Sequence, residues 1–407
     1  MQLPKLGRRV FAVGLAAGVA TAFMIGSAGT VLADTVIKIG TDLTVSGGEA
    51  SQGLPVQQGV LLAIEQANAG APAGFTFELD ALDDAVQGFH NPAQGVANVR
   101  TFVADPSLLG IVGPINSNVA KAEIPITNAA GLLQISQSNT NPTLTKGPDA
   151  AKLRSKPVNN YFRVCTTDDH QGAAGASFAK KLGYKNVFII DDNETYGTGL
   201  ANIFESSFKE GGGTVLGHEH VIKGQQDFKA LLTKVASFKP DLIYFGGVTE
   251  TGGALIRKQM SDVGLGHVGF GAGDGIANAQ FRKVTGEAAN GVFYTVAAPN
   301  VKSLPSAKKF ITDYMKRFNE DIGTYSANGY AAAQVIIAAV ERGIKENGGQ
   351  IPTRADVLKN AQEASLSTPI GKVSFDRNGD TTNGIISAYQ IKDQKPVFIG
   401  EVIEAGT

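Results

Sequence analysis

The segment LLGIVGPINSNVAKAEIPITNAAGLLQIS, residues 108–136, contains the pattern of a strand, a helix and a second strand in that order. Leu108–Val112 is a short apolar run, a helical pattern begins near Ser117 and ends near Ala129, and Leu132–Ser136 is apolar again. Two strands that are joined through a helix pair in parallel, because antiparallel neighbours need only a short hairpin turn. The segment therefore predicts one βαβ unit of an α/β fold.

The same alternation continues upstream of this unit. Strand patterns at Val36–Ile39 and Phe75–Leu79 alternate with helical patterns at Val56–Ala69 and Pro92–Val103. Such a series predicts a parallel sheet with helices on both of its faces. Residues 141–160 interrupt the alternation with three prolines and several basic residues, and we expect a long, solvated surface loop there.

A second alternating series begins after residue 160, and it predicts a second α/β lobe. Its strands are expected at Tyr161–Val164, Asn186–Ile190, Val215–Val221, Leu242–Phe245 and Val268–Phe270. The helices between them are expected at Gln171–Leu182, Thr198–Lys209, Asp227–Phe238 and Thr251–Val263. After a strand at Val292–Thr295 the pattern is helical at Ala307–Asn319, Tyr325–Glu346 and Arg354–Ala364, and short strands close the chain. We interpret this helical return as a crossing back to cover the first lobe, so that several crossings form a hinge.

The N-terminus has the layout of a secretory signal peptide over residues 1–33. A basic start, an apolar run at residues 11–25 and small residues at 31–33 precede a cleavage point before Asp34. An uncleaved membrane anchor is the alternative, but glycines dilute the apolar run. Arg8-Arg9 also resembles a twin-arginine export signal, which leaves the export route open. Because no cysteine lies near the cleavage point, we expect an exported protein without a lipid anchor and not inserted in the membrane.

Composition argues against several classes of partner. The chain has 36 basic and 37 acidic residues, and three of the basic ones lie in the signal segment, so the remainder has four more acidic than basic residues. A slightly acidic chain without a basic cluster has no electrostatic attraction for nucleic acid or for anionic membranes. Cys165 is the only cysteine, so no internal disulfide can form and the hydrophobic core must hold the fold alone.

Signatures of catalysis and of metal binding are weak. The chain has no Gly-x-Ser-x-Gly elbow, Walker sequence, His-Glu-x-x-His or Cys-x-x-Cys motif, and the glycines of residues 269–275 lack dinucleotide spacing. His218 and His220 share one strand face, but two ligands without a nearby third do not predict a metal site, and an exposed strand edge explains them. Residues 376–380 begin like a calcium loop without its final glutamate, and we expect a tight turn. We expect no enzyme, no metal and no cofactor.

Small polar residues follow the ends of several predicted strands. Asn116 and Ser117 follow one strand, residues 138–140 follow the next, and Asp274 follows a strand of the second series. In open parallel sheets, ligands bind beyond the carboxyl ends of the strands. Hydroxyls and helix-start N–H groups suit a carboxylate, and an acid from the other lobe suits an ammonium. Singly, Ser117 is explained as a helix cap and Thr140 as a turn residue, but their coincidence favours a ligand site.

Several short motifs share one order and spacing with a known family. They are Ile37–Gly40 leading to Ser46-Gly47, Ile111–Pro114 leading to Asn116-Ser117, Ser138–Thr145, Phe162-Arg163 before Asp168 and Gln171, Tyr196-Gly197, Tyr244–Gly247, and Phe375-Asp376 before Gly379-Asp380. In these motifs the chain resembles the periplasmic solute-binding proteins of branched-chain amino acid ABC importers, over nearly all of its length after residue 33. The resemblance implies two Rossmann-like lobes that are joined by three hinge strands and close on a solute, the periplasmic binding protein type I fold. The implied lobes are residues 34–165 with 299–378, and residues 166–298 with 379–407.

The resemblance also implies individual site residues. Ser117 and Thr140 would hold the ligand carboxylate together with backbone N–H groups, and Ser138 would offer its carbonyl to the ammonium. Asp274 would pair with the α-amino group from the second lobe. The other implied cleft residues are Asn116, Asn139, Asp168, Tyr196, Gln52 and Val248. Gln52 and Val248 stand where the best-known members have tyrosines, and Asp274 is one methylene shorter than their glutamate, so the pocket is reshaped and the solute stays open.

We therefore expect a monomeric, exported binding protein that captures an amino acid or an analogue and hands it to the permease subunits of an ABC importer. Presentation of the ligand to a chemosensory receptor is an alternative that the sequence does not separate from transport. Binding of an amide, urea, or an aromatic or organic acid is a second alternative. A secreted α/β hydrolase is the alternative from another class, and no assembled nucleophile and base supports it.

Overall fold

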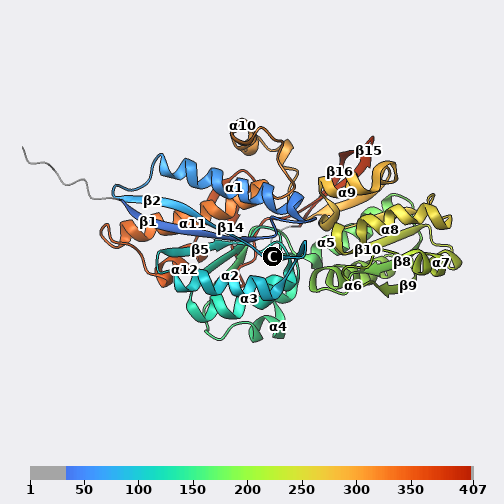
Figure 1. Cartoon of the computed structure of the whole chain (residues 1–407), viewed down its shortest axis with the longest axis horizontal. Helices are drawn as coiled ribbons and strands as arrows, with labels where there is room; N and C mark the ends of the chain where they lie inside the picture. The colour runs from blue at the N-terminus through green and yellow to red at the C-terminus, as the bar shows by residue number, and fades with distance from the viewer. Residues whose placement is uncertain (1–33, 405–407) are drawn as a thin grey trace, which may run out of the picture. The chain divides into compact units, whose positions relative to one another are not determined.

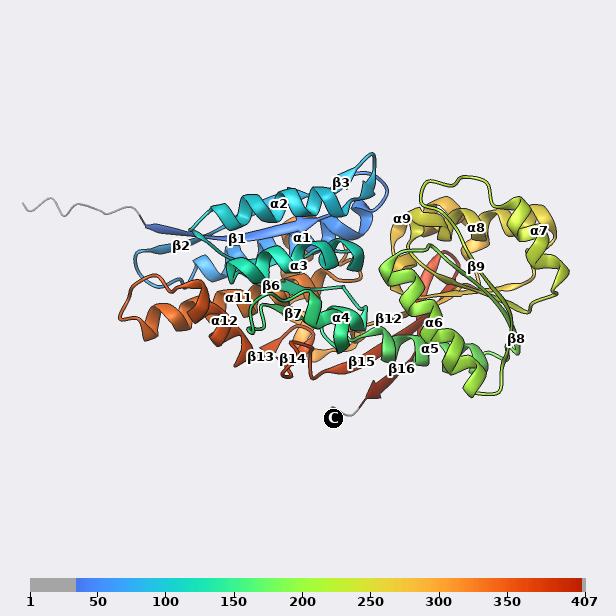
Figure 2. The same ribbon diagram turned by 90° about the horizontal axis from the view of Figure 1, so that it is seen from below.

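The computed structural model describes residues 34–404, so the predicted signal peptide lies outside the described residues. Figures 1 and 2 show two groups of elements, each of them a β-sheet flanked by helices. The first lobe comprises the elements from β1 to β7 and from α10 to β14, and the second lobe comprises those from α5 to β12 together with β15 and β16. The prediction of an α/β fold with two lobes is confirmed.

The first sheet has five parallel strands in the order β2-β1-β5-β6-β7. Their bounds are Thr35–Leu43 for β1, Phe75–Asp83 for β2, Leu108–Val112 for β5, Leu133–Ser136 for β6 and Tyr161–Arg163 for β7. Gly110 of β5 pairs with Leu133 of β6, and α3 (Ser117–Ala130) joins the two strands. The βαβ unit predicted for residues 108–136 is therefore confirmed.

Helices cover both faces of the first sheet. On one face lie α1 (Ala50–Asn68) and α11 (Ser326–Glu346), whose buried side chains form one apolar cluster with the sheet. On the other face lie α2 (Pro92–Ala104) and α3, where Val99 and Phe102 pack against Leu108 and Ile111. The lobe is completed by β3 (Ala85–Val86), β4 (Phe89–His90), α4 (Gly147–Lys152), α10 (Lys308–Phe318), α12 (Arg354–Gln362), β13 (Ser365–Thr368) and β14 (Gly371–Ser374).

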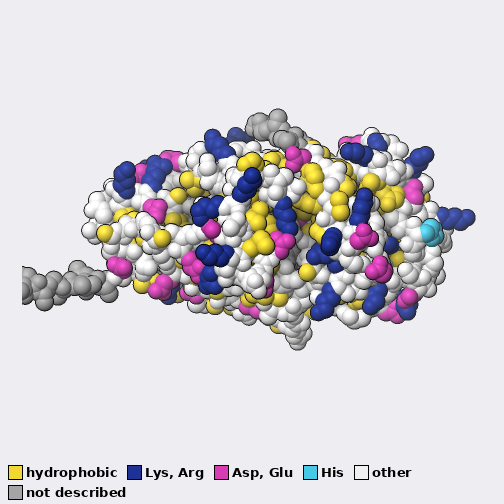
Figure 3. Space-filling model, turned by 90° about the horizontal axis from the view of Figure 1, so that it is seen from above, with side chains coloured by type: hydrophobic (Ala, Val, Ile, Leu, Met, Phe, Trp, Pro, Cys, Tyr) yellow, Lys and Arg dark blue, Asp and Glu magenta, His cyan; other side chains and the backbone are white. Residues whose placement is uncertain are grey.

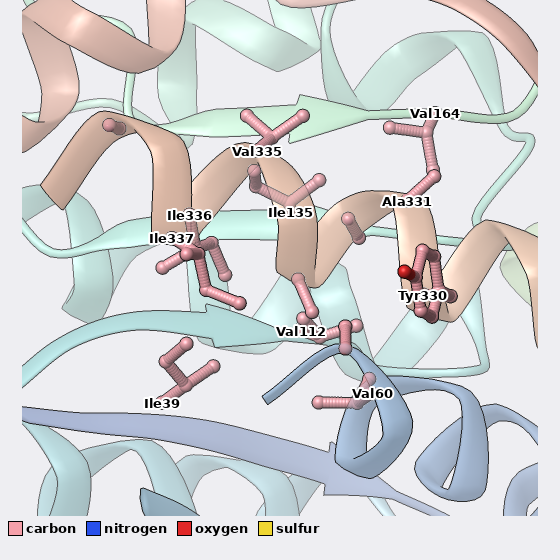
Figure 4. Close-up of a cluster of buried hydrophobic side chains, with 14 of the residues drawn as sticks. Ile39, Val60, Val112, Ile135, Val164, Tyr330, Ala331, Val335, Ile336 and Ile337 are labelled. Carbon is pink, nitrogen blue, oxygen red and sulfur yellow. The ribbon is translucent and has the colours of Figure 1, made fainter. Parts of the chain in front are cut away.

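The core of the first lobe depends on a helix from the far end of the chain. Figure 4 shows Val335 and Ile336 of α11 lying over Ile39, Val112 and Ile135 of the sheet. All five side chains are fully buried, and each such burial contributes roughly 1.5–3 kcal/mol. The predicted return of the chain to cover the first lobe is confirmed, because α11 follows the whole second α/β series.

The second sheet has seven strands in the order β16-β15-β12-β11-β10-β8-β9. Its strands are β8 (Asn186–Asp191), β9 (Thr214–His220), β10 (Leu242–Gly246), β11 (Gly269–Ala272), β12 (Phe293–Val296), β15 (Gly384–Lys392) and β16 (Lys395–Glu404). The strands β8 to β12 are parallel, and the last two are antiparallel. Its helices are α5 (Asp168–Lys181), α6 (Thr195–Glu210), α7 (Lys229–Ser237), α8 (Ala254–Gln259) and α9 (Ala279–Thr285). The strand β9 forms one open edge of this sheet.

Three chain segments connect the two lobes and lie side by side. They run from β7 to α5, from β12 to α10, and from β14 to β15. The backbone N–H of Arg163 donates to the carbonyl of Gly379 at 2.9 Å, and that of Thr166 donates to Ala297 at 3.0 Å. These contacts form the three-stranded hinge that the resemblance implied.

Residues 141–160 differ from the expected solvated loop. They contain a short 3₁₀ helix at Pro142–Leu144 and the helix α4, and Leu144 is fully buried in a cluster with Ile124 and Tyr161. The prediction was wrong for this part because Leu144 and Leu153, which stand among prolines and basic residues, pack into that cluster. The longest exposed stretch of the segment is Ser155–Val158.

The described surface carries mixed charge. On the face drawn in Figure 3, basic and acidic side chains are interspersed, and neither kind dominates a region of that face. Among the described residues, no helix combines the length and the apolar character that crossing a bilayer requires.

Candidate functional site

A small cavity lies where the carboxyl ends of the strands of both sheets face each other. Its volume is about 20 Å³. Seven of the ten predicted site residues line it, namely Gln52, Asn116, Ser117, Ser138, Tyr196, Val248 and Asp274, together with Ile115, Gly275 and Tyr325. Residues from both lobes therefore meet at one point, as the argument from strand ends predicted.

A tight turn after β5 directs the first lobe's polar groups into this cavity. Gly113 has a φ of +133°, and a Cβ atom there would lie 2.1 Å from the backbone oxygen of Asp42, so only glycine fits. The turn places Asn116 directly before α3 and Ser117 at its first position. The Ser117 hydroxyl is buried without a hydrogen-bond partner among the described residues, and the start of α3 offers unpaired N–H groups beside it. This corner is suited to an anion.

The segment after β6 supplies a second hydroxyl. Thr140 is fully buried and does not line the cavity, and its side-chain hydrogen bond to Asp168 acts to lower the pKa of that acid. The Ser138 hydroxyl donates to the carbonyl of Ile115 at 3.0 Å, so it fixes the turn after β5. Asn139 lies outside the lining, and its side chain bonds to Ile115 and Tyr161. The role of Asn139 within the first lobe is therefore one of positioning.

Asp274 is the most strongly coordinated side chain of the site. Its Oδ1 accepts a hydrogen bond from the Tyr196 hydroxyl at 2.9 Å, and its Oδ2 accepts from Tyr325 at 2.6 Å and from Gln171 Nε2 at 2.9 Å. Burial raises the pKa of Asp274 above its ordinary value, and these three donors act against that rise. The carboxylate is thus held in one orientation, with Oδ1 left the freer of its two oxygens.

A second buried acid lies close behind. Asp168 is fully buried at the start of α5, and its backbone N–H donates to the carbonyl of Thr140 at 2.8 Å. Burial and the negative charge of Asp274 raise the pKa of Asp168 well above its ordinary value. A cation bound beside these two acids would favour their ionised forms.

The lobes approach each other closely around the cavity. Gln52 Nε2 of α1 lies 3.5 Å from the backbone oxygen of Asp274, and Asn141 Nδ2 donates to the carbonyl of Thr195 at 2.6 Å. A cavity of about 20 Å³ holds little more than one water molecule, so the lobes must lie further apart than they do here when a solute of amino-acid size is between them. Ile115 and Val248 provide its apolar surface.

Two contributors were not predicted from the sequence. Tyr325 reaches the site from the residue before α11, and Gln171 reaches Asp274 from α5. Gln171 belongs to one of the motifs that the chain shares with the family, but the resemblance assigned it no role in the site. Tyr325 gave no local signal, because its position depends on the last crossing between the lobes.

One reason given against metal binding was wrong. His218 and His220 do lie on the edge strand β9, as expected, but the carboxylate of Asp191 on the adjacent strand β8 lies 2.7 Å from His218 Nε2. A third ligand is therefore close in space although it is distant in sequence. Residues 376–380 form the expected turn, in which Asp376 accepts hydrogen bonds from the backbone N–H groups of Asn378 and Asp380.

The chain is similar to proteins of known kind over nearly all of its length. The model of the family described as periplasmic binding protein matches residues 36–396. A Leu/Ile/Val-binding protein of Rhizobium johnstonii is 32% identical over 362 residues, which cover 88% of this chain and 92% of that protein. A Leu/Ile/Val-binding protein homolog of Brucella melitensis is 31% identical, with 94% and 98% covered. The crystal structure of a leucine-binding protein from Thermotoga maritima superposes with a TM-score of 0.79 at 28% identity, with 90% and 98% covered.

Proposed function

This chain belongs to the periplasmic binding protein family, and from that premise we propose that it captures an amino acid between its lobes and delivers it to an ABC importer. One observation carries the proposal. The cavity offers an anion-binding corner on the first lobe, at Ser117 and the start of α3, and an oriented carboxylate on the second lobe, at Asp274. A zwitterion of the size of an amino acid matches this pair of opposite charges.

The carboxylate end is assigned to the first lobe. The Ser117 hydroxyl is a buried donor that lacks a partner among the described residues, and leaving such a group unpaired costs about 1–3 kcal/mol. A bound carboxylate would accept from Ser117, from Thr140 and from the N–H groups at the start of α3. Because hydrogen bonds to a charged group are about twice as strong as neutral ones, this end would supply much of the affinity.

The ammonium end is assigned to the second lobe, with help from the first. Oδ1 of Asp274 would accept from the ammonium, and the backbone carbonyl of Ser138 would accept a further hydrogen bond. Tyr196 fixes Asp274 from one side. Burial of an ammonium is costly unless an anion and acceptors meet it, and here both are present.

The side chain of the solute is assigned to the apolar part of the cavity. Ile115 and Val248 are aliphatic and Gln52 is polar, and all three line the cavity. We propose an aliphatic amino acid of small to medium size, in agreement with the names of the relatives. Val248 and Gln52 are then the residues that set how large a side chain is accepted.

Capture would work through closure of the lobes. Because the solute contacts both lobes only when they are close, binding shifts the equilibrium of the hinge toward the closed form. We place the lobe limits near residues 165, 298 and 378, within the three connecting segments. Export to the periplasm by a cleaved signal peptide, a monomeric state and delivery to permease subunits complete the proposal.

The test is calorimetric titration of the exported, purified protein with a matched ligand set. We expect L-leucine, L-valine or L-alanine to bind, while 4-methylpentanoic acid, which lacks the amine, and L-leucinamide, which lacks the carboxylate, bind at least roughly 10-fold more weakly. Small-angle scattering should then show a smaller radius of gyration with the best ligand than without it. Equal binding of 4-methylpentanoic acid and L-leucine, or tight binding without compaction, would overturn the proposal.

A further inference from the structure

Three metal-binding side chains meet at the open edge of the second sheet, away from the solute cavity. Asp191 is the last residue of β8, and His218 and His220 lie on the neighbouring edge strand β9. In the parallel register of these strands His220 is paired with Asp191 and His218 with Ile189. Because residues two apart on a strand point to the same face, both imidazoles lie on one side of the sheet.

The ligand atoms are close enough to share one cation. His218 Nε2 lies 2.7 Å from one carboxylate oxygen of Asp191, and His220 Nδ1 lies 2.8 Å from the other. One ligand atom from each residue can be chosen so that all three lie within 4.8 Å of one another. In a tetrahedral zinc site with bonds of about 2.0–2.1 Å, neighbouring ligand atoms lie about 3.3 Å apart. To admit the ion, the two histidine–aspartate contacts would lengthen by about half an ångström, and the widest pair of ligand atoms would close by at most about 1.5 Å.

The ligands are already held in place by a surrounding set of hydrogen bonds. His218 Nδ1 lies 2.7 Å from a carboxylate oxygen of Glu205 on α6, so the ring is held with Nε2 directed toward Asp191, where the metal would lie. Asp191 accepts from the Thr198 hydroxyl at 3.0 Å and from the backbone N–H of Asn193 at 2.7 Å. A carboxylate behind a metal-binding histidine is the usual arrangement in zinc sites, where it fixes the ring and increases its basicity.

The three side chains are also exposed to different degrees, so that an ion can reach the cluster from solvent. The Asp191 side chain is fully buried at the base of the cluster, the His218 side chain is 17% exposed, and the His220 side chain is 55% exposed at its mouth. An ion can therefore enter past His220, and a fourth position stays open toward solvent. Glu219, between the two histidines, pairs instead with Lys234.

We propose that Asp191, His218 and His220 form a site for a divalent transition-metal ion of the zinc class, with water as the fourth ligand. Two imidazole nitrogens and one carboxylate suit zinc better than calcium or magnesium, which prefer oxygen ligands. On binding, the proton between His218 Nε2 and Asp191 leaves to solvent, and the Nδ1 proton of His218 stays on the side of Glu205. The proton of His220 passes from Nδ1, which becomes the ligand, to its other ring nitrogen Nε2. None of the three residues lines the solute cavity, so the site is independent of solute capture.

The competing explanation is an ion-pair cluster without a metal, in which a protonated His218 bridges Asp191 and Glu205. Both explanations agree with the observed distances among Asp191, His218 and Glu205, but they assign different roles to the exposed His220. In the ion-pair cluster His220 is dispensable, whereas in the zinc site it is a ligand. His267 is an exposed histidine elsewhere in the second lobe and serves as the matched control.

The experiment titrates the untagged, EDTA-treated protein with ZnCl₂ by calorimetry. We expect one zinc ion per chain and release of protons, measured in buffers of different ionisation enthalpy. Removing the ligand in His220→Ala should weaken binding by more than 10-fold, and Glu205→Gln should weaken it roughly 10- to 100-fold. The control His267→Ala should bind zinc as the unaltered protein does. Solute affinity should be equal with ZnCl₂ and with EDTA.

A spectroscopic measurement identifies the ligands directly. Titration with CoCl₂ should give visible absorption of a four- or five-coordinate ion, and the band should be lost in His220→Ala. Because His220 is exposed, this variant is expected to fold, and its far-UV spectrum checks that it does. Absence of zinc binding in the unaltered protein, or unchanged binding in both His220→Ala and His218→Gln, would overturn the proposal. A failure of solute binding in the earlier titrations would leave this result unaffected.

Discussion

Nε2 of His90 in the first lobe lies 2.6 Å from a carboxylate oxygen of Glu194 in the second lobe. The other ring nitrogen of His90 contacts Glu49 of its own lobe, and its side chain is fully buried. Lys223 adds a positive charge 2.6 Å from Glu194. Because opposite charges attract strongly where water is excluded, this bridge between the lobes favours the closed arrangement.

The first prediction concerns the charge on His90. Burial alone would lower its pKa, but Glu49 and Glu194 raise it from 6.5 to about 10. A group with a raised pKa stabilises the folded state below the unperturbed value, and that contribution is lost as pH rises through the raised one. Between about pH 6.5 and pH 10, the free energy of unfolding should therefore decline more steeply in the unaltered protein than in His90→Gln.

Urea unfolding at a series of pH values measures this difference. Asp84 and Glu250, with pKa values raised by burial to about 8, titrate in the same window, so the informative quantity is the difference between the two proteins. His267→Gln, at an exposed histidine, should keep the unaltered profile. Parallel profiles for the unaltered protein and His90→Gln would mean that the bridge carries no net charge interaction.

The second prediction concerns the carboxylate of the solute. Replacing Ser117 or Thr140 by Ala removes a hydrogen bond to a charged group, which contributes about 1.5–3 kcal/mol, so affinity should fall roughly 10- to 150-fold. Because the Ser117 hydroxyl has no partner among the described residues, the thermal midpoint should hardly change in Ser117→Ala. Calorimetric titration with the best amino acid measures the effect, and Ser237→Ala, at an exposed serine, is the control. A loss of stability without a loss of affinity would assign these hydroxyls to the fold.

The polar residues of the first lobe were predictable because the chain itself displays their position. Apolar runs end at Val112 and Ser136, and the residues that follow a buried parallel strand must emerge at the same sheet edge. Asn116, Ser117 and Ser138 therefore meet at the cavity. Both sheets were also predictable, because the alternation of strand and helix patterns is visible in the sequence.

What escaped prediction depends on contacts between distant segments. Tyr325 reaches Asp274 only because the chain crosses back between the lobes, and the third member of the histidine cluster, Asp191, is set by the register of two strands. Leu144 is one apolar residue in a polar segment, and its burial against α3 follows from tertiary packing. The order of polar and apolar residues along the chain does not show which distant segments come into contact.

The third prediction concerns the ammonium of the solute. Burial raises the pKa of Asp274 above 3.8, so this carboxyl gains a proton at a higher pH than a surface aspartate does. Only the ionised form attracts an ammonium, and affinity for an amino acid should fall as pH falls through the raised pKa. Asp274→Asn should weaken amino acid binding strongly, hardly affect the desamino analogue, and flatten the pH profile. An unchanged profile in Asp274→Asn would move the ammonium partner to another acid, with Asp168 as the next candidate.

The last prediction concerns the hinge, where Arg163 and Asp380 form a buried ion pair. Arg163 is fully buried, its Nε donates to Asp380 Oδ1 at 2.6 Å, and its Nη1 donates to the carbonyls of Asn139 at 3.0 Å and Asn141 at 2.8 Å. Asp380→Asn leaves the guanidinium without its anion, and breaking such a buried pair costs about 3–5 kcal/mol.

An exposed ion pair of the same chain supplies the comparison for this value. Lys302 and Asp321 lie 2.6 Å apart with side chains that are 59% and 60% exposed, and such a pair contributes at most about 1 kcal/mol. Urea unfolding of Asp380→Asn and Asp321→Asn should therefore give costs that differ at least roughly three-fold. The double variant Arg163→Met/Asp380→Leu should recover only part of the loss, because the carbonyls of Asn139 and Asn141 lose their donor. Equal costs for Asp380→Asn and Asp321→Asn would mean that water reaches the hinge and screens the buried pair.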